Sequence, residues 1–189
     1  AVELGYGFAS GRHKLHLDAY YTLWEDKSIL SDENIQLADS TQTRSLIRGL
    51  NAEHKGIECE YSFQLNSDLQ LEFSASLADW RWKNDVFATL YNDNQVLVDT
   101  MRVYANGLKV GDAPQTQATL QLNYKLADDI DLSANYTYFD RLYANFDPAL
   151  RGIETDRAQP YRIPAYGLID LHLGYFFKLG IIPVYANLS

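Results

Sequence analysis

Residues 118–138 alternate apolar and polar side chains, and this alternation constrains the fold more than any other feature of the chain. The apolar residues are Ala118, Leu120, Leu122, Tyr124 and Leu126, then Ile130, Leu132, Ala134, Tyr136 and Tyr138. Because successive side chains of a strand point to opposite faces, each half predicts a strand with one apolar and one polar face. The short segment Ala127-Asp128-Asp129 predicts a tight turn and therefore an antiparallel hairpin.

The same unit occurs along the rest of the chain, so that the sequence predicts eight strands in hairpins. The other three predicted hairpins join residues 2–8 to 15–23, 57–63 to 69–77, and 169–177 to 184–188. Each strand is about ten residues long, roughly what a tilted strand needs to cross a bilayer. The fold class predicted is an antiparallel transmembrane β-barrel.

The connections between hairpins differ from the turns within them. They are long and polar and cover residues 25–55, 79–117 and 140–165. Short turns at one rim and long loops at the other are typical of outer-membrane barrels, with the loops extracellular. Within the second connection, residues 86–90 and 95–100 predict a small projecting hairpin around Asn92-Asp93-Asn94. Two prolines, Pro160 and Pro164, predict an irregular loop over residues 141–164.

Two features indicate that the apolar face meets lipid. The polar faces carry few lysines, which suits a watery or plugged lumen, and aromatic residues gather near strand ends as in interfacial girdles. A soluble calycin-like binding barrel would instead point its apolar residues inward. A self-contained eight-stranded outer-membrane barrel with a structural or adhesive role is the other alternative.

Composition narrows the class of protein. The net charge of −9 disfavours a nucleic-acid partner, which normally meets a basic surface. No run reaches the roughly 18 apolar residues of a transmembrane helix. The single cysteine, Cys59, cannot form an intrachain disulfide and sits on an apolar face as a small hydrophobic residue. The alternation is already present at residue 1 and continues to residue 189, so we expect residues 1–189 to be a partial barrel truncated at both ends.

Few residues offer catalytic or metal chemistry, and the sequence predicts no enzyme and no cofactor. Glu58 and Glu60 lie on one face of a strand, about 7 Å apart, but have no partner base and are interpreted as lumen-lining charges. His13 and His16 should face opposite sides of a strand, which argues against a metal pair. The acidic residues Asp32, Glu33 and Asp39 lack EF-hand spacing and predict a solvated loop.

Trp80, Arg81 and Trp82 form the most distinctive cluster at the edge of a loop. The preference of Trp for membrane interfaces favours an anchoring role for Trp80, whereas the role of Trp82 stays open between anchoring and contact with a docking solute. The candidate extracellular solute contacts are Trp82, Arg81, Tyr143 and Arg151.

The chain resembles the TonB-dependent receptors of the outer membrane, in the subgroup with an N-terminal carboxypeptidase-regulatory-like domain. The resemblance is carried by residues 79–85 (DWRWKND), 107–115 (GLKVGDAPQ), 143–148 (YANFDP), 157–159 (RAQ) and 163–166 (IPAY). Their order and spacing extend over most of the chain.

The resemblance implies a larger barrel of about 22 strands, of which this chain supplies about eight, filled by an N-terminal plug domain that the chain lacks. It implies TonB-coupled uptake of a scarce small solute, such as an iron–siderophore complex. The implied partners are the plug and remaining strands, the TonB complex acting through the plug, and membrane lipid or lipopolysaccharide. The family has no shared binding motif, so the resemblance assigns no binding residue and does not identify the solute.

Overall fold

The protein is all-β. The computed structural model describes residues 1–37 and 40–189, and for residues 31–34 it describes the backbone alone. The described residues form one antiparallel sheet, whose main path runs β1-β2-β3-β4-β7-β8-β10-β11. The strands are β1 (Val2–Ser10), β2 (His13–Gln36), β3 (Gln42–Gln64), β4 (Leu69–Trp82), β5 (Val86–Asn92), β6 (Leu97–Val103), β7 (Pro114–Ala127), β8 (Ile130–Tyr143), β9 (Arg162–Ile163), β10 (Tyr166–Leu179) and β11 (Ile182–Leu188), with one 3-10 turn, η1 (Pro148–Leu150).

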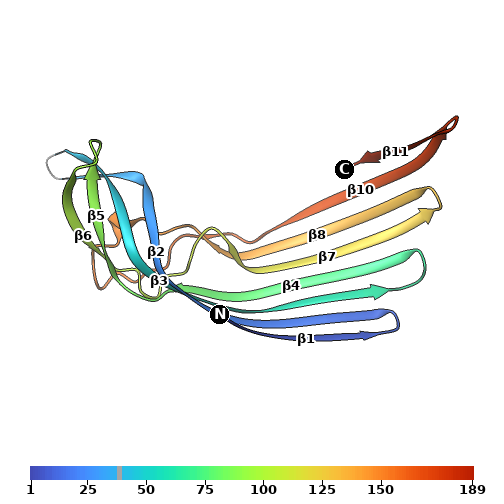
Figure 1. Cartoon of the computed structure of the whole chain (residues 1–189), viewed down its shortest axis with the longest axis horizontal. Coiled ribbons are helices and arrows are strands. Elements are labelled where there is room, and N and C mark those ends of the chain that lie inside the picture. The colour runs from blue at the N-terminus through green and yellow to red at the C-terminus, as the bar shows by residue number, and fades with distance from the viewer. Residues whose placement is uncertain (38–39) are drawn as a thin grey trace.

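The four predicted hairpins are confirmed, and their turns lie together. β1 pairs with β2, β3 with β4, β7 with β8 and β10 with β11. All four turns lie at one end of the sheet, the turn end, whereas β5 and β6 lie at the opposite, loop end (Figure 1). The projecting hairpin is confirmed as β5 and β6, and residues 144–161 contain no strand and only the short 3-10 helix η1. The predicted asymmetry between the two rims is therefore present.

The main sheet does not close on itself. Among the described residues, β1 pairs only with β2 and β11 only with β10. The first and last strands lie far apart at the two edges of the array (Figure 1). The alternative of a self-contained eight-stranded barrel is therefore excluded, because closure would require these edges to hydrogen-bond to each other.

On this sheet the apolar side chains are more exposed than the polar side chains of the opposite face, the reverse of a soluble protein. Leu120 and Leu171 on the apolar face are 45% and 66% exposed. Gln121 and Asn135 on the polar face are directly paired across β7 and β8 and are only partly exposed. Side chains crowd on the inner face of a curved sheet and spread on its outer face. The polar face is therefore inner and the apolar face outer, which contradicts a soluble barrel with an apolar interior.

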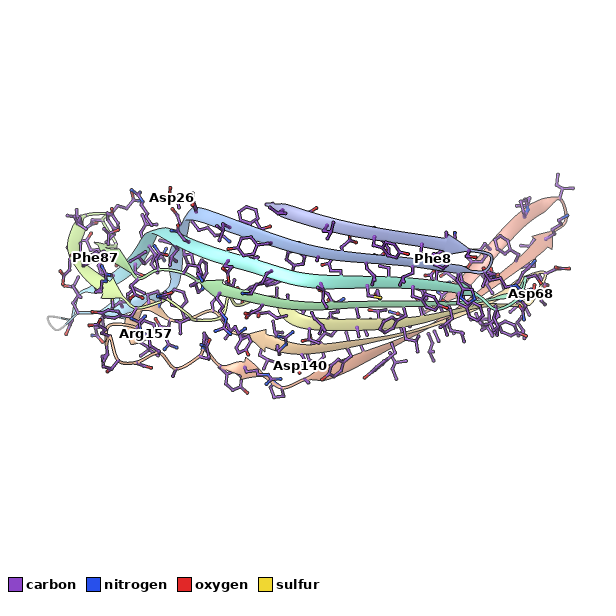
Figure 2. All side chains as sticks on the ribbon, turned by 90° about the horizontal axis from the view of Figure 1, so that it is seen from below. Phe8, Asp26, Asp68, Phe87, Asp140 and Arg157 are labelled. Atoms are coloured by element: carbon purple, nitrogen blue, oxygen red, sulfur yellow. The ribbon has the colours of Figure 1, made fainter. Side chains whose placement is uncertain are left out.

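The predicted loop over residues 25–55 is wrong, because β2 and β3 continue through it as a long ribbon. This ribbon bends away from the wall, the name we give to the part of the main sheet between the turn end and the bend (Figure 1). The pairing shifts register between Trp24 and Lys27, and the bend contains Asp26 and Gly49, with positive φ of 54° and 76°. Figure 2 shows Asp26 at this elbow. The glycine adopts this backbone at little cost, whereas a bulkier residue would be strained.

Amide side chains hold the elbow in place. The Asp26 amide donates to Asn51 Oδ1 at 3.1 Å, and the Asn51 amide donates to Asn84 Oδ1 at 2.8 Å. Asn84 Nδ2 in turn donates to the Gly49 carbonyl at 2.7 Å. These bonds satisfy backbone groups that the irregular pairing leaves without a partner.

The hydrophobic core lies at the loop end and not in the wall. We call it the loop core: Ile47, Leu50, Ala52, Trp82, Val86, Ala88, Val103, Ala105, Leu108 and Phe146. β5 extends the ribbon by pairing with the first part of β3, and β6 pairs with β5. The long connections therefore fold into a packed unit with its own dry interior.

Among the described residues, no helix has the length and apolar character needed to span a membrane.

Candidate functional site

A buried glutamine joins the sequence segments that define the loop end. Gln115 is fully buried, and its Oε1 accepts from the Trp80 amide at 3.1 Å. Its Nε2 lies 3.3 Å from the Trp80 carbonyl and 3.2 Å from that of Val110, and donates to them. Lys109 donates from Nζ to Gln115 Oε1 at 3.4 Å and also pairs with Asp79. One side chain thus ties β4 to residues 109–115.

In the same segment, the backbone at Gly111 lies so close to the backbone of residues 144–145 that only glycine fits. A Cβ atom on Gly111 would lie 2.7 Å from the backbone of Ala144 and Asn145. The Asp112 amide donates to the Tyr143 carbonyl at 2.9 Å, which holds the two segments together. Any side chain at Gly111 would push residues 143–145 away.

An ion pair between Arg157 and Asp85 ties the third connection (residues 140–165) to the second (residues 79–117). Arg157 donates from both Nη1 and Nη2 to the Asp85 carboxylate, at 2.7 and 2.9 Å. The Asn106 amide also donates to Asp85 Oδ1, at 2.9 Å. The Arg157 guanidinium lies over the Tyr104 ring, 5.1 Å from its centroid. Hydrogen bonding from Arg157 is the main cause that holds the pKa of Asp85 below its usual value.

We expect this link to weaken in acid. The pKa of Asp85 is lower in the folded protein than in the unfolded chain, where it is about 4. The stability that the link contributes is therefore fully present above the unfolded-state pKa and is lost as the pH falls through the folded-state pKa. Asp85→Asn should remove the contribution at neutral pH. Hydrogen exchange of the Asn106 amide measures it: protection should fall in the variant and change little with pH in this window. The control Asp93→Asn, in the exposed β5–β6 turn, should behave as the wild type; equal protection in Asp85→Asn would contradict the role assigned to the link.

The inner face carries an aromatic cluster at the height where the wall meets the loop core. We define the inner aromatic cluster as Tyr20, Trp24, His54 and Trp80, with Lys27. The rings of His54 and Trp80 stack with centroids 5.0 Å apart, and Trp24 lies 6.4 Å from His54. Trp80 Nε1 donates to the Tyr20 hydroxyl at 3.0 Å. Four side chains from the three strands β2, β3 and β4 therefore form one surface.

This cluster combines the exposed Trp24 ring with the ammonium group of Lys27. Trp24 is 51% exposed although its side chain lies on the inner face. Lys27 Nζ lies 5.6 Å from the Trp24 ring centroid and 5.8 Å from that of Trp82. His54 Nε2 is buried and, among the described residues, has no hydrogen-bond partner. Such a surface can stack a flat ring on Trp24 and donate a hydrogen bond from Lys27 beside it.

The prediction that Trp80 anchors the wall in the membrane interface is wrong. The unbroken pairing of β3 with β4 places Trp80 on the same face as the polar residues Gln70 and Ser76. A tryptophan on that face cannot reach lipid. Its preference for interfaces is a tendency of isolated residues, and the strand register decides its direction.

The predicted solute contacts lie at different depths of the loop end. Trp82 is 3% exposed and packs edge-on against Phe146 in the loop core. Arg151 is also buried, and its Nη1 donates to the Ala158 carbonyl at 2.9 Å. Arg81 pairs with Asp79 at 3.0 Å, and Tyr143 is half-buried at the end of β8. The structure does not gather these four side chains around one cavity, and their contact with a solute stays a prediction.

The other titratable residues that the sequence singled out do not gather. Glu58 and Glu60 are exposed on the inner face, opposite Ser76 and Ser74. His13 stacks on Phe63, and His16 on the other face lies 3.5 Å from Asp18. Within the described part of the chain, no three His, Cys, Asp or Glu residues could hold a metal ion. Asp39 and the side chains of Asp32 and Glu33 lie outside the described residues.

Sequence reasoning missed most of the inner aromatic cluster. Lys27 and His54 fall in the connection predicted over residues 25–55, and Trp24 lies just before it, beyond the predicted strand. One signal was available: the chain's three tryptophans are Trp24, Trp80 and Trp82. All three lie on the inner face within this region, but only the register of β2, β3 and β4 shows it.

The family model that matches the chain agrees with this architecture. The family model described as "TonB dependent receptor-like, beta-barrel" matches residues 1–187. No curated protein matches the chain. Among solved structures, the chain is similar to the toluene transporter TbuX of Ralstonia pickettii, with 14% identity and a TM-score of 0.45. The alignment covers 92% of this chain and 50% of that one, so the chain spans about half the length of the transporter.

Proposed function

The chain belongs to the TonB-dependent receptor β-barrel family, and from this premise we propose that it supplies wall and outer loops to a receptor for TonB-coupled uptake of a scarce solute. Barrels of this family lie in the outer membrane and serve transport, and they are not enzymes. The apolar outer face and polar inner face support this role, because they suit a wall between lipid and a filled pore.

The inner aromatic cluster is the surface on which we expect the solute to dock. It faces the pore side of the wall and lies beside the loop core, where a solute arriving from outside meets the barrel first. The exposed Trp24 ring, with Lys27 Nζ beside it, is the feature that supports this assignment. Trp82, Arg81, Tyr143 and Arg151 remain further candidates for contact in the loaded receptor.

We propose that the solute is an iron–siderophore complex or a similar chelate. The charge of the inner face narrows the choice among chemical classes of chelate. That face carries more acids than lysines along its strands: Glu3, Asp18, Glu58, Glu60, Glu72, Asp131 and Asp170 against Lys14, Lys27, Lys125 and Lys178. A strongly anionic catecholate chelate would be repelled along this wall, whereas a neutral hydroxamate chelate would not.

The proposal extends to the rest of the receptor. The unpaired edges of β1 and β11 support a larger barrel, because backbone groups in lipid must be hydrogen-bonded. The polar inner face supports a plug domain inside that barrel, and TonB would act through the plug. We expect the remaining strands to come from the same receptor chain.

Uptake by the full receptor in the outer membrane tests the function. Cells with and without TonB would be given radiolabelled ferric hydroxamate or ferric catecholate chelate. We expect TonB-dependent uptake of the hydroxamate and much less of the catecholate. Uptake that does not depend on TonB would refute energy-coupled import, and preference for the catecholate would refute the charge argument alone.

Replacing Trp24 tests the docking surface. Trp24→Ala should weaken binding of the transported chelate by about two- to tenfold, since one stacking contact is lost. Trp24→Phe keeps a ring and should retain most of the affinity. Titration of the purified receptor, followed by tryptophan fluorescence, measures both. Unchanged affinity in Trp24→Ala would show that the solute docks elsewhere, without affecting the uptake result.

A further inference from the structure

Lys27 is a cation without an anion at the top of the inner face. It follows Asp26 at the elbow (Figure 2), and its pairing with Leu50 places its side chain on the inner face. The side chain is only partly exposed. Its neighbours Glu25 and Asp26 form no ion pair with it, and nor does any other carboxylate of the described residues. A partly buried ammonium in this state gains free energy from an anion that reaches it.

Two indole rings hold this ammonium in place but do not neutralise it. Lys27 Nζ lies 5.6 Å from the ring centroid of Trp24 and 5.8 Å from that of Trp82. A cation–π contact offsets part of the free energy that the charge loses on leaving water, but the rings carry no net charge. Trp82 belongs to the loop core, whereas Trp24 is exposed on the surface where we expect the solute to dock. The ammonium therefore lies between the dry core and the docking surface.

The acids along the inner wall lie too far from this ammonium to balance its charge. Glu3 is paired with Tyr20, four positions before Trp24 on β2. Asp18 and Glu58 are paired with each other two positions further towards the turn end. At about 3.3 Å per residue, these two rows lie about 13 and 20 Å from Trp24. Both distances exceed the Debye length of about 8 Å at physiological ionic strength, so that the inner face is acidic along the wall and cationic at its top.

We infer that Lys27 is a specificity-determining residue, which selects a chelate that carries one carboxylate beside a flat or apolar part; this inference rests on the proposed function. The carboxylate accepts a hydrogen bond from the Lys27 ammonium, while the neighbouring part of the solute covers the Trp24 ring. The rest of the solute is neutral, because further negative charge would face the acids of the wall. The solute class is thereby narrowed to a hydroxamate chelate with a single pendant carboxylate.

Binding of two matched chelates to the purified full receptor tests this inference. Both are ferric trihydroxamates with the same skeleton, one with a pendant carboxylate and the other with the corresponding primary amide, and calorimetry measures each affinity. The wild type should bind the carboxylate about tenfold more tightly than the amide, as expected for one charge-assisted hydrogen bond. Lys27→Gln should lose this preference and keep its affinity for the amide, whereas Lys27→Arg should retain the preference.

The matched control is Lys14→Gln, which removes an exposed cation from the same face of β2 near the turn end and should keep the preference. Equal binding of the two chelates by the wild type would overturn the inference. An equal loss of affinity for both chelates in Lys27→Gln would also overturn it, because it would indicate a merely structural role. Both of these outcomes leave the proposed function standing, whereas binding of neither chelate would refute the proposed function and this inference together.

Discussion

Trp82→Ala is expected to destabilise the loop end by about 3–5 kcal/mol, the usual cost of removing a fully buried tryptophan. Trp82 is 3% exposed, contacts Phe146 at 6.1 Å between ring centroids, and belongs to the only hydrophobic core among the described residues. The loop core should open while the wall stays paired. Limited proteolysis at neutral pH should then cut residues 83–110 rapidly in the variant and slowly in the wild type.

The control for this prediction is an exposed tryptophan of the same chain. Trp24 is 51% exposed, so that Trp24→Ala should leave the protease resistance of residues 83–110 almost unchanged. Trp82→Phe should lie between the wild type and Trp82→Ala, because it keeps an aromatic contact with Phe146. Equal resistance of Trp82→Ala and the wild type would show that the loop core is not a cooperative unit.

Leu120→Arg is expected to destabilise the membrane-inserted wall by about 2–4 kcal/mol, the cost of an arginine on the lipid face near the middle of the bilayer. Leu120 lies between Phe73 and Tyr136 on the outer face of β7 and is 45% exposed. The exposed leucine side chain costs no free energy in lipid, whereas an arginine at this position would have to give up its hydration. Reversible unfolding of the full receptor from lipid vesicles by denaturant would measure the change.

Gln121→Arg provides the comparison, one residue further along the same strand. Gln121 lies on the inner face between Glu72 and Asn135, where an arginine can stay hydrated and face an acid. We expect this variant to lose much less stability than Leu120→Arg. The reverse order would mean that the assignment of faces is inverted, and it would remove the basis of the membrane interpretation.

Most of the wall could be predicted from the sequence, because a period of two residues is a local signal. The turns at Gly11, Asp68, Asp129 and Gly180 separate the strands that the structure pairs. The loop end could not be predicted in the same way. β2 and β3 pass through a bulge at Asp26 and Gly49, and beyond it β3 pairs with β5, which is more than thirty residues away in the sequence.

The candidate site was predicted only in part, and the reason is the same. Trp80 and Trp82 were evident as a motif, but the partners that give them a role come from β2 and β3. Local pattern does not encode which residue of a neighbouring strand stands opposite. A shift of the β2–β3 register would separate Trp24 from His54 without changing either strand's alternation.

The sequence by itself determined that the chain forms amphipathic antiparallel strands with short turns at one rim and long connections at the other. Each of these features depends on neighbouring residues, through side-chain alternation and turn chemistry. Only the tertiary structure decided that the long connections fold into a packed core and that the tryptophans meet on the inner face. These features depend on strand register and on contacts between distant segments, where burial and charge pairing are set by the whole sheet.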